Sequence, residues 1–286
     1  MRTRLFFVLA LALVWCATAS AQATQPITVV ADYWVKPGKE EDFLWLVNNY
    51  GGPVRDKLMA EGVVMAWGVD VPVFRAPGQP THSIWYDVAD WGGVEKVMAG
   101  MEAKLKELTD QDKKAAEDAR RRGQRAPMST AERIEATFDL SKTKDWIFRN
   151  LYVKFSSAPP PADASPVTRI FLVTAKPGKA AEWRAAFDKY FKPTLDAAVD
   201  NGTIGAWGLG IEEVRSSGEF THFVWVGYPN MAAMEKMRNT MVAMGAKRSE
   251  GENEHINDVF TATSEAAAAR SFLLRPIIFK MGGPPK

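Results

Sequence analysis

The hydrophobic pattern of the chain occurs twice. Residues 27–35 and 167–175 are rich in β-branched and aromatic side chains, and both segments stop at a Lys-Pro-Gly-Lys turn, so each is predicted to be a strand. Apolar residues then recur at helical spacing over 43–58 and 183–198. A proline interrupts each predicted helix at an equivalent place, which predicts a kink or a break there.

Each half continues with the same order of elements. A second strand is followed by a polar turn, a third strand that completes a hairpin, a second amphipathic helix and a final strand. The predicted strands are 63–74, 81–88 and 150–155 in the first half and 204–214, 221–228 and 276–280 in the second. The polar turn of the second half is predicted at 216–219. Each half therefore has the order β-α-β-β-α-β of a ferredoxin-like unit.

The two halves also align directly, without a gap. A shift of 140 residues places Ala66-Trp67-Gly68 on Ala206-Trp207-Gly208, and Thr81-His82 on Thr221-His222. Over 27–98 against 167–238, 19 of 72 positions are identical, and they cluster at turns and strand centres. This clustering indicates a tandem duplication of one structural unit.

The domain boundaries follow from composition. Residues 1–21 have the charged, apolar and small-residue order of a secretory signal peptide. The first unit is predicted over 22–157 and the second over 167–286. The first contains a charged helical insertion near 102–125, which is expected to be a solvated extension of its second helix. Between them, 158–166 is rich in proline and reads as a linker.

These motifs resemble the dimeric α+β barrel superfamily, which includes antibiotic-biosynthesis monooxygenase-like, EthD-like, NIPSNAP-like and stress-responsive barrel proteins. The resemblance implies an α+β fold in which two ferredoxin-like units pack their antiparallel sheets into one barrel with the helices outside. A tandem duplication allows one chain to form this barrel, as a monomer with an internal pseudo-dimer. The fold alone does not determine a function.

Charge and cysteine content exclude several classes of function. Cleavage after residue 21 removes two arginines, so the net charge falls from +2 to 0, which gives no electrostatic basis for binding nucleic acid or for stable membrane association. The only cysteine, Cys16, lies in the signal segment, so disulfides and thiolate chemistry are excluded from the mature chain. The expected location is secreted or periplasmic.

Two histidines are the candidate catalytic residues. His82 and His222 occupy equivalent strand positions, and histidine is the commonest general acid or base at neutral pH. The alternative is that both are buried structural residues. The polar neighbours Ser83, Tyr86 and Asp87 favour His82 as the functional one of the pair.

Further candidates for ligand binding surround these histidines in the sequence. They are Trp67, Trp85, Trp207, Trp225, Tyr50, Tyr190 and Asp32. The tryptophans either line an aromatic pocket beside the histidines or belong to the core. Asp32 replaces Leu172 of the second unit and is expected to pair with Arg55 or His82, or to face solvent.

The sequence leaves three functions open and does not decide whether the protein is an enzyme. The first is binding of a small apolar or aromatic ligand. The second, implied by the resemblance, is a cofactor-independent monooxygenase, cyclase or isomerase that uses His82 or His222. The third, also implied by it, is haem binding with His222 as axial ligand. No metal-site spacing is present, and no cofactor is predicted.

Overall fold

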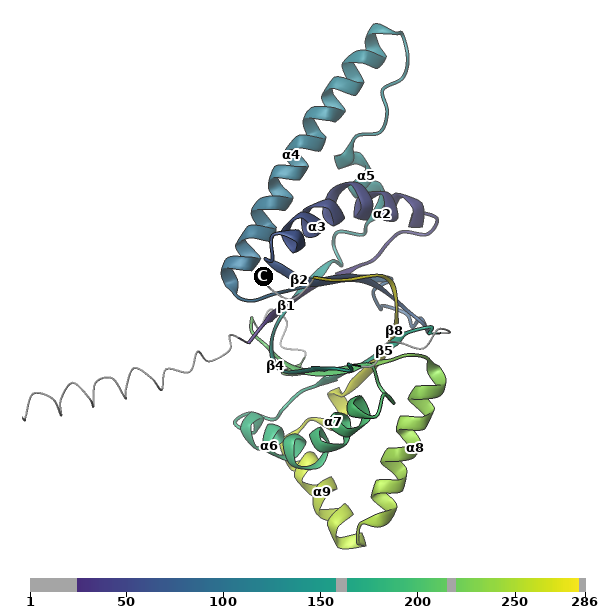
Figure 1. Cartoon of the computed structure of the whole chain (residues 1–286). Coiled ribbons are helices and arrows are strands. Elements are labelled where there is room, and N and C mark those ends of the chain that lie inside the picture. Colours follow the sequence, from purple (N-terminus) through teal and green to yellow (C-terminus); the bar gives the residue numbers. More distant parts are fainter. Residues whose placement is uncertain (1–24, 158–163, 215–219, 283–286) are drawn as a thin grey trace, which may run out of the picture.

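The computed structural model describes residues 25–157, 164–214 and 220–282. These residues form a closed barrel of antiparallel strands, with helices packed on two opposite outer sides (Figure 1). The predicted signal peptide at 1–21, most of the linker at 158–166 and the turn at 216–219 lie outside the described residues.

Each unit contributes half of the barrel. The strands are β1 (Ile27–Tyr33), β2 (Val64–Pro72), β3 (His82–Val88) and β4 (Lys144–Phe155) in the first unit, and β5 (Val167–Val173), β6 (Ala206–Glu212), β7 (His222–Tyr228) and β8 (Arg270–Met281) in the second. Their order around the ring is β1-β3-β2-β8-β5-β7-β6-β4. The last strand of each unit therefore joins its own first strand to the second strand of the other unit. This confirms the predicted barrel of two ferredoxin-like units in one chain.

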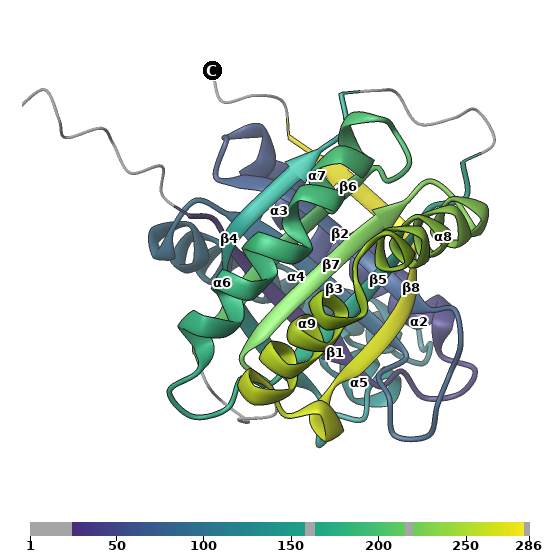
Figure 2. The same cartoon turned by 90° about the horizontal axis from the view of Figure 1, so that it is seen from below.

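Helices cover the outer face of each half-barrel, and Figure 2 shows those of the second unit lying over its strands. The helices are α2 (Glu40–Leu46), the π-helix η1 (Val47–Gly51), α3 (Gly52–Ala60), α4 (Trp91–Arg121) and α5 (Thr130–Thr137), then α6 (Ala180–Tyr190), α7 (Lys192–Asp200), α8 (Met231–Lys247), α9 (Glu250–Thr263) and the 3₁₀ turn η2 (Ala266–Ala268). Pro53 and Pro193 lie in the first turns of α3 and α7, so the predicted interruptions are confirmed. Helices α5 and α9 were not predicted.

The charged insertion of the first unit extends α4 away from the barrel (Figure 1). It was expected to be a solvated helix, but the side chains of Leu108 and Ala119 are buried. The Asp112 carboxylate also accepts a hydrogen bond from the backbone N–H of Thr130, at 2.7 Å. The extension therefore packs against the returning chain at the start of α5.

Both faces of the barrel sheet are buried, and the residues of β7 alternate between them. Val224 and Val226 face the helices, whereas Phe223 and Trp225 face the barrel interior. The interior cluster combines both units, since Phe148 of β4 stacks on Phe223 at a ring distance of 4.5 Å. Side chains therefore fill this part of the barrel from both halves.

The repeated Ala-Trp-Gly motif has a packing role. Gly208 of β6 lies directly opposite Trp225 of β7, and a Cβ atom on Gly208 would sit 2.6 Å from the indole Cε2. Gly68 has the same relation to Trp85 in the first unit. Glycine is needed at both positions because the indole lies against the neighbouring backbone.

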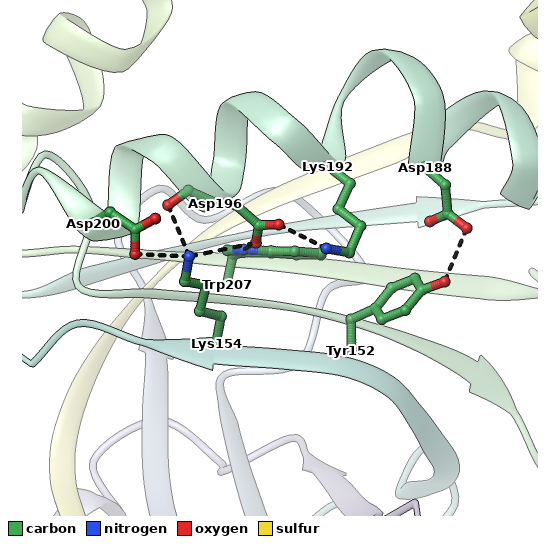
Figure 3. Close-up of polar contacts among 7 residues, drawn as sticks. All are labelled: Tyr152, Lys154, Asp188, Lys192, Asp196, Asp200 and Trp207. Atoms are coloured by element: carbon green, nitrogen blue, oxygen red, sulfur yellow. Dashed lines mark hydrogen bonds and ion pairs between the residues drawn. The ribbon is translucent and has the colours of Figure 1, made fainter.

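The aspartate that binds the tryptophan of the same motif lies at the contact between the two units. In Figure 3 the Trp207 indole N–H donates to Asp196 of α7 at 3.1 Å, and Lys192 contacts the same carboxylate at 2.6 Å. Lys154, from β4 of the first unit, reaches the backbone oxygen of Asp196 and the Asp200 carboxylate, at 3.2 and 2.7 Å. A helix of one unit is thus bonded to a strand of the other.

The same arrangement recurs across the pseudo-symmetric contact. The Trp67 indole donates to Asp56 of α3 at 2.9 Å, and Lys280 of β8 contacts that carboxylate at 2.7 Å. In both copies the aspartate that accepts the indole N–H is therefore also contacted by a lysine of the other unit.

Replacing Asp196 by alanine is expected to lower the free energy of unfolding by about 1–3 kcal/mol. The change leaves the indole N–H of the fully buried Trp207 without its acceptor. Asp200→Ala is the matched control, because its exposed ion pair with Lys154 contributes less than about 1 kcal/mol. Urea unfolding of both variants measures the difference, and equal losses would contradict the assignment.

Candidate functional site

A pocket of about 470 Å³ opens in the second unit where β5 leads into α6. The turn after β5, the start of α6, the end of β6 and the start of β7 form its wall. Its polar lining residues include Lys176, Arg184, Glu212, Thr221, His222 and Glu265, and its apolar ones Ala175, Pro177, Ala180 and Ile211. The pocket therefore combines apolar wall residues with several convergent polar groups.

Hydrogen bonds hold the imidazole of His222 in place. The Thr221 hydroxyl donates to the carbonyl of Val173 at 3.1 Å and accepts the backbone N–H of Ala175 at 2.8 Å. The contact of 2.7 Å between this hydroxyl and His222 Nδ1 can form with either ring tautomer. The guanidinium of Arg184 has only donors, so its Nη1 contact with Nε2 at 3.4 Å favours the tautomer that carries the proton on Nδ1 and leaves Nε2 as the acceptor.

Arg184 is positioned to act together with His222. It lies on α6, and its Nη1 atom is 3.4 Å from His222 Nε2. Trp183, the preceding residue, packs on the imidazole at a ring distance of 4.5 Å and limits its rotation. A basic nitrogen and a guanidinium therefore meet at the wall of the pocket. Such a pair can accept a proton from an acidic O–H group and stabilise the resulting anion.

The equivalent place in the first unit lacks these groups. His82 has the same bond to a threonine, Thr81, and packs on Phe43 at 4.2 Å. Burial lowers the pKa of His82 to about 4, so its imidazole is neutral at physiological pH. Where the second unit has Arg184 and Glu212, the first has Leu44 and Pro72.

The sequence argument that favoured His82 rested on Ser83, Tyr86 and Asp87, and two of these, Ser83 and Asp87, lie on the other side of the sheet. Ser83 bonds to Asp32 inside the barrel, and Asp87 accepts a hydrogen bond from Thr28. Because successive residues of a strand point to opposite faces, these polar side chains do not surround His82. The geometry therefore favours His222 as the candidate functional histidine.

The structure does not bring the four candidate tryptophans together. Trp67 and Trp207 lie among the helices, whereas Trp85 and Trp225 face the barrel interior. The sheet separates the two pairs, and none of the four lines the pocket at His222.

The candidate tyrosines also lie away from this pocket. Tyr50 belongs to η1, and Tyr190 ends α6 with the Lys189 ammonium 4.9 Å from its ring. Of the residues singled out from the sequence, His222 alone is in the lining.

The expected partners of Asp32 were wrong. Its carboxylate accepts hydrogen bonds from the Ser83 hydroxyl and from the Trp146 indole, the latter at 2.8 Å, and it bonds to neither Arg55 nor His82. Asp32 points into the barrel while those two side chains lie on the helix side. Burial raises its pKa, and the two hydrogen bonds oppose that rise.

The part of the chain that the structure describes contains no group of three histidine, cysteine, aspartate or glutamate side chains suited to a metal ion. Among the same residues, no helix is both long enough and apolar enough to cross a bilayer.

Comparisons with known proteins identify the architecture. No protein-family model matches the chain, and no curated protein matches its sequence. A provisionally assigned monooxygenase from Fusobacterium nucleatum matches in structure with a TM-score of 0.58, at 11% identity, over 91% of this chain and 96% of that chain. One from Lactobacillus acidophilus matches with a TM-score of 0.55, at 11% identity, over 91% and 97%. An anthrone oxidase-like protein matches with a TM-score of 0.49, at 12% identity, over 93% and 96%.

These matches, together with the closed ring of strands, define the fold class. The chain has the fold of the dimeric α+β barrel superfamily, with both units of the pseudo-dimer in one chain. At such low identity the likeness concerns the fold, and a function has to be argued from the site.

Proposed function

We propose that the protein binds a small aromatic molecule carrying a weakly acidic O–H group, such as a phenol, in the pocket at His222. The observation that carries this proposal is the pairing of the His222 Nε2 atom with Arg184 at the wall of the pocket. Nε2 accepts the O–H proton or its hydrogen bond, the guanidinium stabilises negative charge on the oxygen, and the apolar wall contacts the ring. The order of residues 1–21 supports a further proposal, that the protein works outside the cytoplasm.

Calorimetric titration with 1-naphthol tests the binding proposal. His222→Ala and Arg184→Leu are each expected to weaken binding about tenfold or more, because each removes one partner of the ligand oxygen. Arg184→Leu introduces the residue that the first unit carries at this position, Leu44, and so limits the risk to folding. His82→Ala is the matched control and should leave the affinity unchanged. Equal effects of the two histidine variants would refute the proposed site.

A second candidate function is oxygenation of such a molecule without a cofactor. The basic Nε2 beside a guanidinium favours it, because deprotonation makes an electron-rich ring reactive toward O₂. Where the O–H group is the enol of a ring ketone, the keto form carries a ring CH₂. Oxidation of that CH₂ to C=O by O₂ releases one water, and the substrate itself supplies the electrons. Oxygen uptake with anthrone measures this activity, and His222→Ala should abolish it. Binding of anthrone without oxygen uptake would contradict oxygenation and support the binding function only.

The residues at His222 do not fit an axial ligand of haem. The Arg184 guanidinium lies next to Nε2, where the iron would have to bind, and Nδ1 is committed to Thr221. In the first unit, Phe43 packs directly on the His82 ring. We therefore do not propose haem binding.

A further inference from the structure

A buried arginine without an acidic partner lies in the first unit. Arg55 of α3 is 5% exposed, its Nε atom has no hydrogen-bond partner, and no carboxylate of the described residues forms an ion pair with it. Its guanidinium lies 5.6 Å from the Tyr86 ring centre and 5.8 Å from that of Trp67. Tyr33 and Tyr50 also interact with it electrostatically. A full positive charge is thus enclosed mainly by aromatic side chains.

The second unit shows that the fold does not require this charge. Leu195 takes the place of Arg55 there and belongs to the apolar core. Gly51 is replaced by Phe191, and a Cβ atom on Gly51 would lie 2.5 Å from Arg55 Nη1. The other exchanged positions are Tyr33 and Tyr86 in the first unit, and Val173 and Val226 in the second. The arginine, the glycine beside it and two of the tyrosines are therefore a feature of one copy.

Enclosing an unpaired cation is costly, since the attraction of aromatic rings replaces only part of its hydration. The tyrosines do not supply a negative charge, because burial raises the pKa of Tyr86 to about 12 and raises that of Tyr33 as well. A negative charge brought by a ligand would compensate the guanidinium, and phenolic hydroxyls can donate further hydrogen bonds to it.

We infer that Arg55, with Tyr33, Tyr50 and Tyr86, forms a second binding site that takes a small organic carboxylate. The planar guanidinium matches the two oxygens of a carboxylate group, and the aromatic surroundings suit a small apolar body. This site lies between the helices and the sheet of the first unit. It is separate from the pocket at His222 and does not depend on the function proposed there.

Thermal unfolding of the full chain with formate, acetate and benzoate tests the inference. At least one of the three should raise the melting temperature in a concentration-dependent way, because a ligand bound to the native state stabilises it. Arg55→Leu, which introduces the residue of the second unit, should abolish this shift. It should also raise the melting temperature without ligand, because an unpaired buried charge is removed. Arg184→Leu should leave the carboxylate effect intact, which separates this site from the pocket at His222.

A milder variant keeps the charge and covers the case in which Arg55→Leu does not fold. In Gly51→Ala the new methyl group displaces the guanidinium, so carboxylate binding should weaken about tenfold while the fold is retained. Gly251→Ala, with no atom within 4 Å of the new Cβ, is the control. The inference is overturned if none of the three carboxylates stabilises the wild-type protein, or if Gly51→Ala binds them as the wild type does.

Discussion

Replacing Asp70 by asparagine is expected to remove a large part of the pH dependence of stability. Asp70 is 8% exposed inside the barrel, and burial raises the pKa of its carboxyl to about 7, although the Trp85 indole donates to it at 2.9 Å. The native state therefore retains a proton that the unfolded chain releases above its ordinary pKa of 3.8. Stability from this group is fully present below pH 3.8 and is lost as the pH rises to about 7.

The loss amounts to about 4 kcal/mol at most, at roughly 1.4 kcal/mol per pKa unit. Urea unfolding of the wild type and of Asp70→Asn at several pH values gives the difference between their free energies of unfolding, in which groups common to both proteins cancel. This difference should change between pH 4 and pH 7 and stay constant above pH 7. For Asp87→Asn the corresponding difference in the free energy of unfolding should stop changing near pH 6, because burial raises the pKa of the Asp87 carboxyl to about 6. If the difference in the free energy of unfolding between the wild type and Asp70→Asn did not change with pH, the Asp70 carboxylate of the wild type would be solvated.

The second large effect is expected from Gly208→Ala. The added methyl group would overlap the indole of Trp225, which the strand holds inside the barrel, and such overpacking costs roughly 1–3 kcal/mol or more. Gly227→Ala is the matched control, because its Cβ would lie at least 3.8 Å from its neighbours. Chemical denaturation of both variants provides the comparison.

Trp225→Ala supplies the internal test of this explanation. In that background the indole is absent, so adding Gly208→Ala should cost much less than it does in the wild type. An undiminished cost would trace the effect to the strand backbone instead.

Most of the fold could be predicted because the duplication marks each element twice. Helices α5 and α9 were missed although both begin with a capping box, Ser129 with Glu132 and Ser249 with Glu252. Their apolar positions are few, so the hydrophobic pattern alone did not reveal them.

The candidate site was less predictable, because its parts come from separate elements. His222 was among the predicted candidates, but its contact with Arg184 depends on how α6 packs beside β7, and sequence spacing does not encode this. Comparing the two copies would have provided a signal, since Leu44 stands where the second copy has Arg184. Asp32 was assigned the wrong partners because Trp146, on β4, is 114 residues away in the sequence.

The pairing of β2 with β8 has a consequence for how the chain reaches its native state. Ala66 lies opposite Met281, so the ring cannot close until nearly the whole chain is available. Until then β2 and β5 each present an unpaired row of backbone N–H and C=O groups, which is a template for association with other chains. Contacts between residues so distant in sequence also form slowly. Removing the last strand would thus leave two open sheet edges, and we expect aggregation of such a chain rather than a stable smaller barrel.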